Sequence, residues 1–551
     1  MNMKRILLLL ALFPCILAAK QPQLQITPQP REISLAKGSF NMRGAGFNYA
    51  SGLEERTVKA IAALADDLSA ATGKVSSLAV AAGVSADAKA SSLKGVYFLL
   101  DRALPAEDYR IEISRKGVKV TASEHNGFLY AVQTLRQMLP VGLYKGQAGG
   151  KVKLPCGVIS DGPRFGYRGL LLDACRHFWS LEETRKIIDI MAVYKFNRLH
   201  WHLTEDQGWR IEIKRYPLLT EKGAFRSGTQ IGYDRDSSDG VRYGGFYTQE
   251  QIKEIVAYAW ERGITVIPEI DLPGHMLGAL AAYPELGCTG GPYEVWTRWG
   301  VSKDVLCVGK EETFIFLEGV LDEVCELFPS EYIHIGGDEC PKASWEKCPA
   351  CQAKADELGL VSDEKGSREN KLQTYVTHRI QKYLSGKGRK VIGWDEILEG
   401  DDLDPGTTVM SWRGTKGGIT AAGRGLDVVM SPNKYCYLDY TQSEDFDNEP
   451  LGITRGRRER TLPLSKTYGY EPYEGLPEDA QKHILGVQAN LWTEYIATPE
   501  HLEYMLLPRL SAISEVQWSP AEARDFNRYH AALVDHQQKV FEILGFNYRK
   551  E

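Results

Sequence analysis

The stretch YIHIGGDECP, residues 332–341, ends a short apolar run with two glycines and two adjacent carboxylic acids, Asp338 and Glu339. Like charges in contact repel each other and raise each other's pKa, so such a pair requires a partner or a function. For an isolated pair, a solvated loop with both acids facing water is the ordinary explanation, because exposed acids are the norm. The rest of the chain decides between these two interpretations.

The apolar run in this stretch is one of eight that follow one another after Arg164, several of them separated by helical patterns. The eight runs are YRGLLLDAC, FNRLHWHL, ITVIPEIDL, YIHIGGDE, KVIGWDEI, TTVMSWRG, DVVMSPNKYCYLD and ILGVQANLW. Helices are predicted over residues 181–194, 249–261, 311–327, 371–384 and 499–510. Near-continuous apolar strands that alternate with helices indicate parallel pairing. Eight such units in ~350 residues predict an α/β fold, a (β/α)8 TIM barrel.

The residues before the barrel have a different pattern. Helices are predicted over residues 53–72 and 128–139, and short alternating strands over 95–100, 108–114 and 117–123. The predicted domains are therefore a signal peptide over residues 1–19, a small N-terminal α+β domain over 20–160 and the barrel over 161–551. The pattern of residues 529–544 predicts a closing helix of the barrel.

Composition and the N-terminus exclude several classes of protein. The chain has 551 residues and a net charge of −6, which gives no indication of a nucleic-acid or anionic-membrane partner. Lys4 and Arg5 precede an apolar stretch that is typical of a secretory signal and too short for a membrane span. We therefore expect an exported protein, periplasmic or extracellular, with no membrane span. A lipoprotein anchored through Cys15 is the less favoured alternative, because Phe13 and Pro14 stand where small residues are expected.

Nine cysteines remain after the predicted signal, an odd number for an oxidising compartment. Cys340, Cys348 and Cys351 are grouped in CPKASWEKCPAC. A zinc site would need a further pair of cysteines or histidines, which this part of the sequence does not supply. The favoured interpretation is a loop disulfide beside a free thiol.

Aromatic and ionisable residues stand at the predicted carboxyl ends of all eight strands, where TIM barrels place their chemistry. They are Arg176 with His177, His200 and His202 with Glu205 and Asp206, Asp271 with His275, Asp338 with Glu339, Trp394 with Asp395 and Glu396, Trp412 with Arg413, Tyr437 with Asp439, and Trp492 with Glu494. Aromatic faces stack on the C–H faces of sugars, and charged side chains bind their hydroxyls. The ring predicts a carbohydrate site.

The adjacent acids also restrict the mechanism. Glycosidases that use two carboxylates hold them on opposite sides of the scissile bond, ~5 to 9 Å apart. If Glu339 donates a proton to the leaving oxygen, Asp338 is badly placed to attack the far face. A substrate that carries its own nucleophile, a 2-acetamido group, solves this problem, with Asp338 accepting the amide N–H.

The order of the motifs LLLDACRHF, NRLHWHLTEDQGWR, IPEIDLPGH, HIGGDE, WDE, SWRG, YLD and LWTEY resembles the glycoside hydrolase family 20 β-N-acetylhexosaminidases. The similarity covers residues 168–518, and the domain that begins ITPQP resembles that family's N-terminal domain. It implies an exo-acting hydrolase that removes terminal β-linked GlcNAc or GalNAc from glycans or chitooligosaccharides, without a cofactor or metal. The residues leave open the choice between these sugars, the linkage and the oligomeric state.

By matching positions, the resemblance implies Glu339 as the general acid/base and Asp338 as the residue that orients the acetamido group. The remaining positions implied as substrate-binding are Arg176, Glu205, Asp206, His275, Trp394, Trp412, Tyr437, Asp439, Trp492 and Glu494. The family commonly has Asp-Asp where this chain has Glu205-Asp206, which puts the role of Glu205 in doubt.

Other interpretations compete with this one. Release of a disaccharide, as by a lacto-N-biosidase, is an alternative within the family. The pattern of His200 and His202 also suggests a metal-dependent amidohydrolase, although later strands offer no further ligands of that kind. A carbohydrate-binding protein without activity is disfavoured because Glu339 and Tyr437 are both present. Trp296 and Trp299 either stack on a sugar or fix a long loop, and the latter is favoured. The basic run of residues 455–460 is a solvated loop by default and a site for an acidic sugar or sulfate otherwise.

Overall fold

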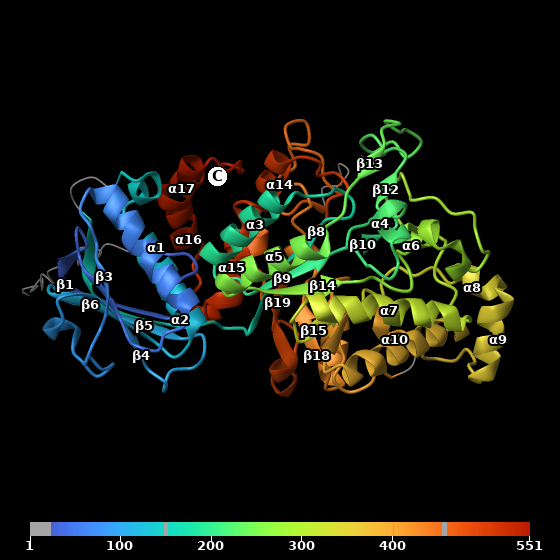
Figure 1. Ribbon diagram of the computed structural model, residues 1–551, viewed down its shortest axis with the longest axis horizontal. Coiled ribbons are helices and arrows are strands. Elements are labelled where there is room, and N and C mark those ends of the chain that lie inside the picture. Colours follow the sequence, from blue (N-terminus) through green and yellow to red (C-terminus); the bar gives the residue numbers. More distant parts are fainter. Residues whose placement is uncertain (1–23, 148–151, 401, 455–459) are drawn as a thin grey trace, which may run out of the picture.

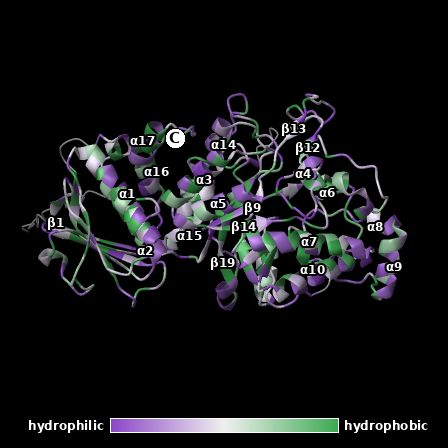
Figure 2. Ribbon diagram, viewed as in Figure 1, coloured by the Kyte–Doolittle hydropathy of each residue, from purple (hydrophilic) through white to green (hydrophobic). Residues whose placement is uncertain are grey.

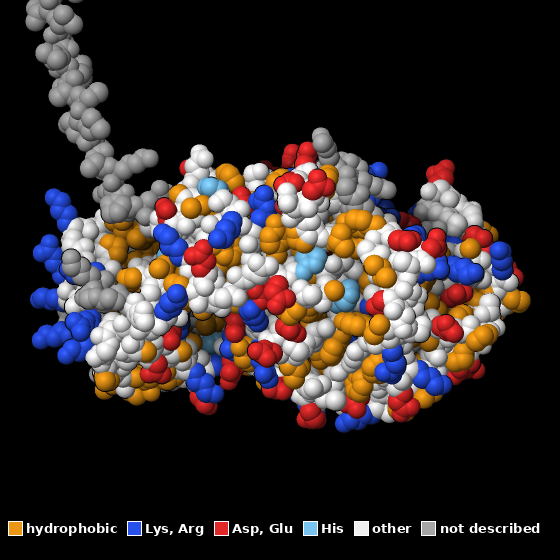
Figure 3. All heavy atoms as spheres, turned by 90° about the horizontal axis from the view of Figure 1, so that it is seen from above, with side chains coloured by type: hydrophobic (Ala, Val, Ile, Leu, Met, Phe, Trp, Pro, Cys, Tyr) orange, Lys and Arg blue, Asp and Glu red, His pale blue; other side chains and the backbone are white. Residues whose placement is uncertain are grey.

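The computed structural model describes residues 24–147, 152–400, 402–454 and 460–551, and it shows an N-terminal domain beside a barrel (Figure 1). The predicted signal peptide, Cys15 and residues 455–459 of the basic run lie outside the described residues. Lys and Arg side chains gather at the end of the molecule that carries the N-terminal domain (Figure 3).

The N-terminal domain is one sheet covered by helices α1 (Glu55–Thr72) and α2 (His125–Gln137). Its seven strands have the order β1-β7-β5-β6-β4-β2-β3. Their bounds are β1 Glu32–Asn41, β2 Phe47–Tyr49, β3 Leu78–Val80, β4 Gly95–Leu100, β5 Tyr109–Ile113, β6 Gly117–Ala122 and β7 Lys153–Asp161. Strands β4, β5 and β6 confirm the three predicted strands. The sequence patterns did not predict β1 or β7, which pair with each other along one edge of the sheet.

The second domain is a closed barrel of eight parallel strands, which confirms the predicted TIM-barrel fold. The strands are β8 Tyr167–Asp173, β9 Arg198–His202, β14 Thr265–Glu269, β15 Tyr332–His334, β16 Lys390–Trp394, β17 Thr408–Ser411, β18 Asp427–Met430 and β19 Ile484–Leu491. Each of the eight predicted apolar runs contains one of them. Their inner faces pack around side chains such as Leu171, Ile267 and Met410. The carboxyl ends of all eight strands therefore open at one end of the barrel.

The outer helices bury one face against the strands, and helices such as α7 and α10 carry both hydrophobic and hydrophilic side chains (Figure 2). The longer ones are α3 Leu181–Val193, α5 Gln249–Glu261, α7 Glu311–Leu327, α10 Arg368–Gly386, α14 Pro499–Leu506 and α15 Arg509–Trp518. Helices α5 and α7 have the predicted bounds. The single helix predicted over residues 499–510 is wrong, because Pro508 has no N–H to continue the ladder and separates α14 from α15.

Shorter elements complete the barrel domain. They are β10 Thr204–Glu205, β11 Gly208–Trp209, α4 Leu218–Glu221, β12 Phe225–Arg226, β13 Tyr243–Gly244, α6 Leu277–Ala282, α8 Ala343–Lys347, α9 Pro349–Glu357, α11 Lys416–Gly423, α12 Asn433–Cys436 and α13 Leu464–Tyr468. The predicted closing helix consists of α16 Phe526–Ala532 and α17 Gln538–Leu544, joined by one π-helical turn. Among the described helices, none combines the length and the hydropathy that a bilayer span requires.

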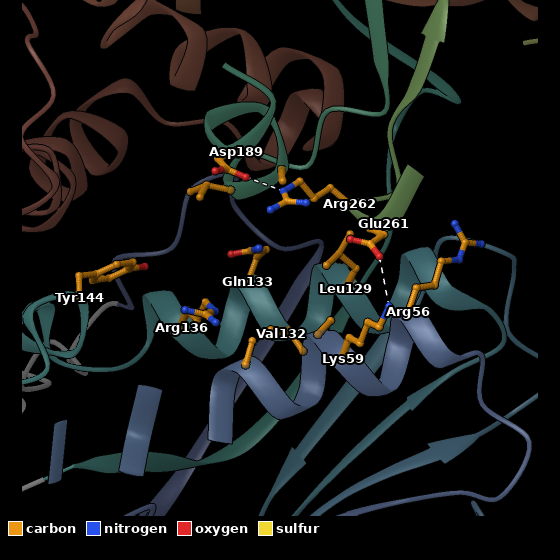
Figure 4. Close-up of a pocket in the computed structure, with 14 residues that line it drawn as sticks. Arg56, Lys59, Leu129, Val132, Gln133, Arg136, Tyr144, Asp189, Glu261 and Arg262 are labelled. Carbon is orange, nitrogen blue, oxygen red and sulfur yellow. Dashed lines mark hydrogen bonds and ion pairs between the residues drawn. The ribbon is translucent and has the colours of Figure 1, made fainter. Parts of the chain in front are cut away.

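The two domains meet across a groove of about 320 Å³ between α1 and α2 on one side and α3 and α5 on the other (Figure 4). Ion pairs line this groove. Lys59 on α1 contacts Glu261 at 3.3 Å, and Arg262 contacts Asp189 at 2.5 Å. These pairs are partly exposed, so each contributes little to stability.

A second ion pair, between the buried Arg168 and the partly buried Glu107, also joins the two domains. The Arg168 guanidinium on β8 donates to both oxygens of Glu107, at 2.9 and 2.8 Å, and to the hydroxyl of Tyr130 at 2.7 Å. Burial raises the pKa of Glu107, but the charge and hydrogen bonds of Arg168 outweigh it and lower that pKa to about 2. The pair therefore stabilises the folded protein wherever Glu107 is ionised.

Replacing Glu107 by Gln should lower the free energy of unfolding by about 3 kcal/mol at neutral pH, because it leaves the buried Arg168 without its counter-ion. The folded-state pKa lies below the unfolded value, so this stabilisation is complete above about pH 4.5 and disappears as the pH falls towards about 2. Urea unfolding of both proteins between pH 7 and pH 2.5 measures the difference, which should shrink with falling pH. Glu55→Gln, at an exposed acid, is the control and should change little. A Glu107→Gln protein as stable as the wild type would contradict the assignment.

Candidate active site

A cleft of about 320 Å³ opens at the carboxyl ends of the barrel strands. The structure brings eight of the twelve predicted site residues together as its lining: Arg176, Asp338, Glu339, Trp412, Tyr437, Asp439, Trp492 and Glu494. The other four, Glu205, Asp206, His275 and Trp394, are buried. The cleft therefore collects side chains that lie more than 300 residues apart in the sequence.

The two glycines before Asp338 explain how β15 turns so abruptly. Gly336 and Gly337 have φ values of +64° and +95°, and a Cβ at Gly336 would lie 1.7 Å from Oδ1 of Asp271. That same Asp271 oxygen accepts a hydrogen bond from the Gly337 N–H at 3.0 Å. Glu339 also has a positive φ, +42°, although it is not a glycine. Such strain persists only where the surroundings enforce it, and it is concentrated at functional sites.

The imidazole of His275 connects the acidic pair to the buried residues behind it. Its Nε2 lies 3.7 Å from Oδ2 of Asp338 and 3.8 Å from Oε2 of Glu339, and its Nδ1 lies 2.8 Å from Oε1 of Glu205. Burial disfavours the charged ring, but Glu205 and Asp271 outweigh burial and raise the pKa of His275 well above its ordinary value. A cationic His275 therefore faces both acids at neutral pH.

Glu205 has a defined place in this arrangement. Its Oε1 accepts from Arg176 at 2.5 Å as well as facing His275, and its Oε2 accepts from the main-chain N–H of Asp206. Burial raises the pKa of Glu205, but Arg176 and His275 outweigh it and lower that pKa to about 2. Glu205 thus joins the arginine that lines the cleft to the histidine that faces the acids, while Asp206 accepts from the main chain of Ser302 at 2.9 Å.

The pKa values of the acids that line the cleft are raised. Burial, followed by the charge of Asp338, raises the pKa of Glu339. Burial likewise raises the pKa values of Asp338, Asp439 and Glu494. Glu339 is more accessible than Asp338, because 44% of the Glu339 side chain is exposed and only 14% of the Asp338 side chain. Glu339 is therefore suited to deliver a proton to a ligand in the cleft.

Aromatic rings form the wall of the cleft. Trp412 and Tyr437 stack with ring centroids 6.1 Å apart, and Trp492 lies 6.4 Å from Tyr437 and 5.9 Å from Trp394. The indole N–H of Trp412 donates to Glu396 at 2.8 Å, which fixes its orientation. Burial raises the pKa of Tyr437 well above its usual value, so its hydroxyl remains a neutral hydrogen-bond donor. The wall offers apolar faces and one hydroxyl.

A buried carboxylate that the sequence did not single out lies below the cleft. Glu269, at the end of β14, is contacted by His202, by His200 at 2.9 Å and by His334 at 3.0 Å. The indole of Trp394 also donates to it, at 2.9 Å. His200 and His202 therefore contact this carboxylate from alternate positions of one strand. The histidine at the end of β15 and the alternation in β9 were the available indications of this cluster.

The structure also adds residues to the lining of the cleft. They are Trp299, Gly300, Val301, Asn433, Tyr440, Ile453 and Arg460. Trp299 is 2% exposed and lies beside the ring of His177, so it both fixes its loop and borders the cleft. Arg460 is the one described residue of the predicted basic run. The sequence had singled out Trp299 and the basic run that contains Arg460, but no local pattern distinguished the other five positions.

Comparison with known families agrees with this geometry. A profile described as glycosyl hydrolase family 20, catalytic domain, matches residues 165–521, and one described as domain 2 of the same family matches residues 23–162. The chain belongs to glycosyl hydrolase family 20. As a family 20 protein it is a glycoside hydrolase, which confirms the predicted class of enzyme.

Solved family 20 structures have the same fold. An exo-β-N-acetylglucosaminidase from Vibrio harveyi superposes with a TM-score of 0.81 at 33% identity, over 96% of this chain and 78% of that one. A β-N-acetylhexosaminidase from Streptomyces coelicolor A3(2) gives 0.80 at 31% identity, over 96% and 98% of the two chains. The β-hexosaminidase of Porphyromonas gingivalis is 42% identical over 98% of this chain. The chain spans 67% of that protein and 64% of a Vibrio furnissii β-hexosaminidase that is 39% identical over 74% of this chain.

The contact between Glu205 and His275 can be tested by titration. Glu205→Gln should lower the pKa of His275, because the carboxylate that stabilises the imidazolium is removed. NMR of histidine-labelled protein, with His275 assigned from a His275→Gln sample, measures the midpoint. Glu221→Gln, remote from the cleft, should leave the midpoint unchanged. An unaltered His275 midpoint in the Glu205→Gln protein would contradict the proposed electrostatic link.

Proposed function

We propose that this family 20 protein is an exo-acting β-N-acetylhexosaminidase that removes terminal β-linked GlcNAc or GalNAc with retention of configuration. The observation that carries this proposal is the contact of Asp338 and Glu339 with the same nitrogen of His275. Two acids that face one imidazole nitrogen lie on one side of the cleft, so they do not flank an anomeric carbon. The nucleophile must then come from the substrate, and a 2-acetamido group provides it.

In the proposed first step, the protonated Glu339 donates its proton to the glycosidic oxygen while the bond from that oxygen to the anomeric carbon breaks. The acetamido carbonyl oxygen attacks the same carbon from the opposite face and forms an oxazolinium ion. In the second step the Glu339 carboxylate takes a proton from water as the water oxygen bonds to the anomeric carbon. The oxazolinium ring opens, the acetamide is regenerated, and two inversions give net retention.

The neighbouring residues have defined roles in this proposal. Asp338 accepts the acetamide N–H and stabilises the positive charge that develops on the ring, which is electrostatic stabilisation of the transition state. Tyr437 donates its hydroxyl to the carbonyl oxygen and so directs that oxygen towards the anomeric carbon. Trp394, Trp412 and Trp492 enclose the methyl group and exclude water from it.

The size and polarity of the cleft favour removal of one terminal sugar. Its volume of about 320 Å³ is at the small end for ligand sites. Arg176, Asp439 and Glu494 place a guanidinium and two carboxyl groups along it, which suits the hydroxyls of a sugar end. The V. harveyi structure with 33% identity is described as an exo-β-N-acetylglucosaminidase in complex with N-acetylglucosamine. We propose that the natural substrates are glycans or chitooligosaccharides and that the protein is exported, as its first residues predict.

The decisive assay compares the 4-nitrophenyl β-glycosides of N-acetylglucosamine and of glucose. Participation of the acetamide predicts that kcat/KM for the glucoside is lower by at least a factor of ~10³, because the glucoside carries no internal nucleophile. Release of 4-nitrophenol measures both rates. Similar rates on the two glycosides would refute neighbouring-group participation.

Variants of the two acids should behave differently. Glu339→Gln should lower kcat/KM by ~10² to 10⁴ on an oligosaccharide, and by much less in the first step on an aryl glycoside with a very good leaving group. Asp338→Asn should lower the rate by ~10² to 10³ on both substrates, because the Asp338 side chain stabilises the formation of the oxazolinium ion from each of them. Glu346→Gln, an exposed acid on the same segment, is the control and should have wild-type rates. Wild-type rates for both acid variants would overturn the assignment.

A further inference from the structure

Four cysteines from the segments after β14 and β15 converge outside the cleft: Cys288, Cys307, Cys348 and Cys351. The Sγ atom of each cysteine lies within 4.8 Å of the other three Sγ atoms. The Sγ–Sγ distances are 3.6 Å from Cys307 to both Cys348 and Cys351, and 3.9 Å from Cys288 to Cys351. A disulfide needs about 2.05 Å, so these are separate thiols that face one centre.

The prediction of a loop disulfide among Cys340, Cys348 and Cys351 is wrong. All nine described cysteines are free thiols, and Cys340 is not part of the cluster. Near these cysteines in the sequence there is no second pair of zinc ligands, which is why a zinc site was not predicted. Cys288 and Cys307 supply that pair from the loop that follows β14.

The spacing of the sulfurs fits a tetrahedral metal site. Zinc binds thiolate sulfur at about 2.3 Å with tetrahedral geometry, which places neighbouring sulfurs about 3.8 Å apart. Three of the six sulfur–sulfur distances, from 3.6 to 3.9 Å, agree with this value, and the others are within 4.8 Å. A cluster of several iron ions bridged by sulfide would need more room between the cysteine sulfurs, whereas a single ion fits the space as it is.

We infer that Cys288, Cys307, Cys348 and Cys351 bind one zinc ion as a tetrathiolate structural site. Four protein ligands leave no open position on the ion, which is the arrangement of structural and not catalytic zinc. None of the four cysteines lines the cleft. The inference is therefore independent of the proposed glycosidase mechanism.

Helix α9 and Gly309 present main-chain N–H groups to the sulfurs. Cys348 is the N-cap of α9 and Cys351 lies in its first turn, so the positive end of this helix faces the cluster. The main-chain N–H of Gly309 donates to the sulfurs of Cys307 and Cys351. A Cβ at Gly309 would lie 2.2 Å from the main chain of Ala350, so only glycine allows this loop to approach α9 so closely. Such outer hydrogen bonds orient the ligands of a metal.

The position of the cluster indicates what the zinc would stabilise. Cys288 and Cys307 follow His275 on the loop after β14, and Cys348 and Cys351 follow Glu339 on the segment after β15. Helices α8 and α9 lie at the end of the molecule farthest from the N-terminal domain (Figure 1). The ion would therefore link the segment that carries His275 to the segment that carries Asp338 and Glu339.

One hydrogen bond between these segments, and one within the segment after β14, connect the region of the cluster to the cleft. The indole of Trp345 donates to the carbonyl of Leu306 at 2.9 Å, and the N–H of Leu306 donates to the carbonyl of Pro273 at 3.0 Å. Pro273 precedes His275 by two residues. Loss of the ion should therefore disturb the placement of His275 without removing any group from the cleft.

Metal analysis of the full chain tests the inference. The reduced wild-type protein should contain one zinc per chain by plasma mass spectrometry, after purification and after reconstitution with zinc alone. Cys348→Ser should lower the zinc content at least tenfold. Cys325→Ser is the matched control, because Cys325 is a half-buried cysteine of α7 outside the cluster, and it should retain one zinc. A wild-type protein that fails to bind zinc when reduced, or that contains iron instead, would overturn the assignment.

A second measurement on the wild type does not depend on the folding of any variant. Alkylation in denaturant and chelator, without reductant, followed by peptide mapping should find all four cysteines as free thiols. Reduced apoprotein reconstituted with cobalt should show the intense visible bands of tetrahedral cobalt bound to thiolates. Peptides linked by a disulfide between any two of the four cysteines, or a cobalt spectrum without those bands, would refute the site.

Discussion

The imidazole of His275, held between the carboxylate of Glu205 and the acids Asp338 and Glu339, is the interaction on which the cleft depends. Two adjacent carboxylates in a buried site repel each other, and burial raises the pKa of both. A cation at 3.7 to 3.8 Å from each acid makes this arrangement tolerable. The backbone accepts strain to achieve it, because His275 and Glu339 have φ values of +52° and +42°.

Two groups of buried ionisable side chains lie behind these acids. Glu205 stands between Arg176 and His275, and the separate carboxylate of Glu269 is contacted by three histidines. Buried charges are costly unless each has partners, and removing one member leaves the others uncompensated. The polar interior is therefore a liability for stability, which the apolar packing between strands and outer helices must offset. It also gives the catalytic groups one fixed geometry.

The sequence predicts most of what depends on local pattern. The eight apolar runs located all eight barrel strands, and helices α5 and α7 have the predicted bounds. The pairing of β1 with β7 was not predictable, because it joins segments more than 100 residues apart. The cysteines show the same limit. The proximity of Cys340 to Cys348 in the sequence was misleading, since Cys340 is outside the cluster and Cys348 contacts Cys307, which lies on another loop. Likewise, Glu269 was not singled out, because an acid within a strand gives no indication of the histidines around it.

This chain has Glu205 where the family commonly has aspartate, and the length of the glutamate side chain gives this difference a physical explanation. One oxygen of Glu205 contacts both Arg176, at 2.5 Å, and His275, at 2.8 Å, while the other accepts from the main chain. An aspartate here would place its carboxylate about one carbon–carbon bond, ~1.5 Å, closer to the backbone, so it would lose one of these contacts unless the loops moved. The extra methylene thus sets the distance between the strand end that carries Arg176 and the loop that carries His275. That loop continues to Cys288 and Cys307. Glu205 therefore restrains the loop near His275, and the four-cysteine cluster restrains it at its other end.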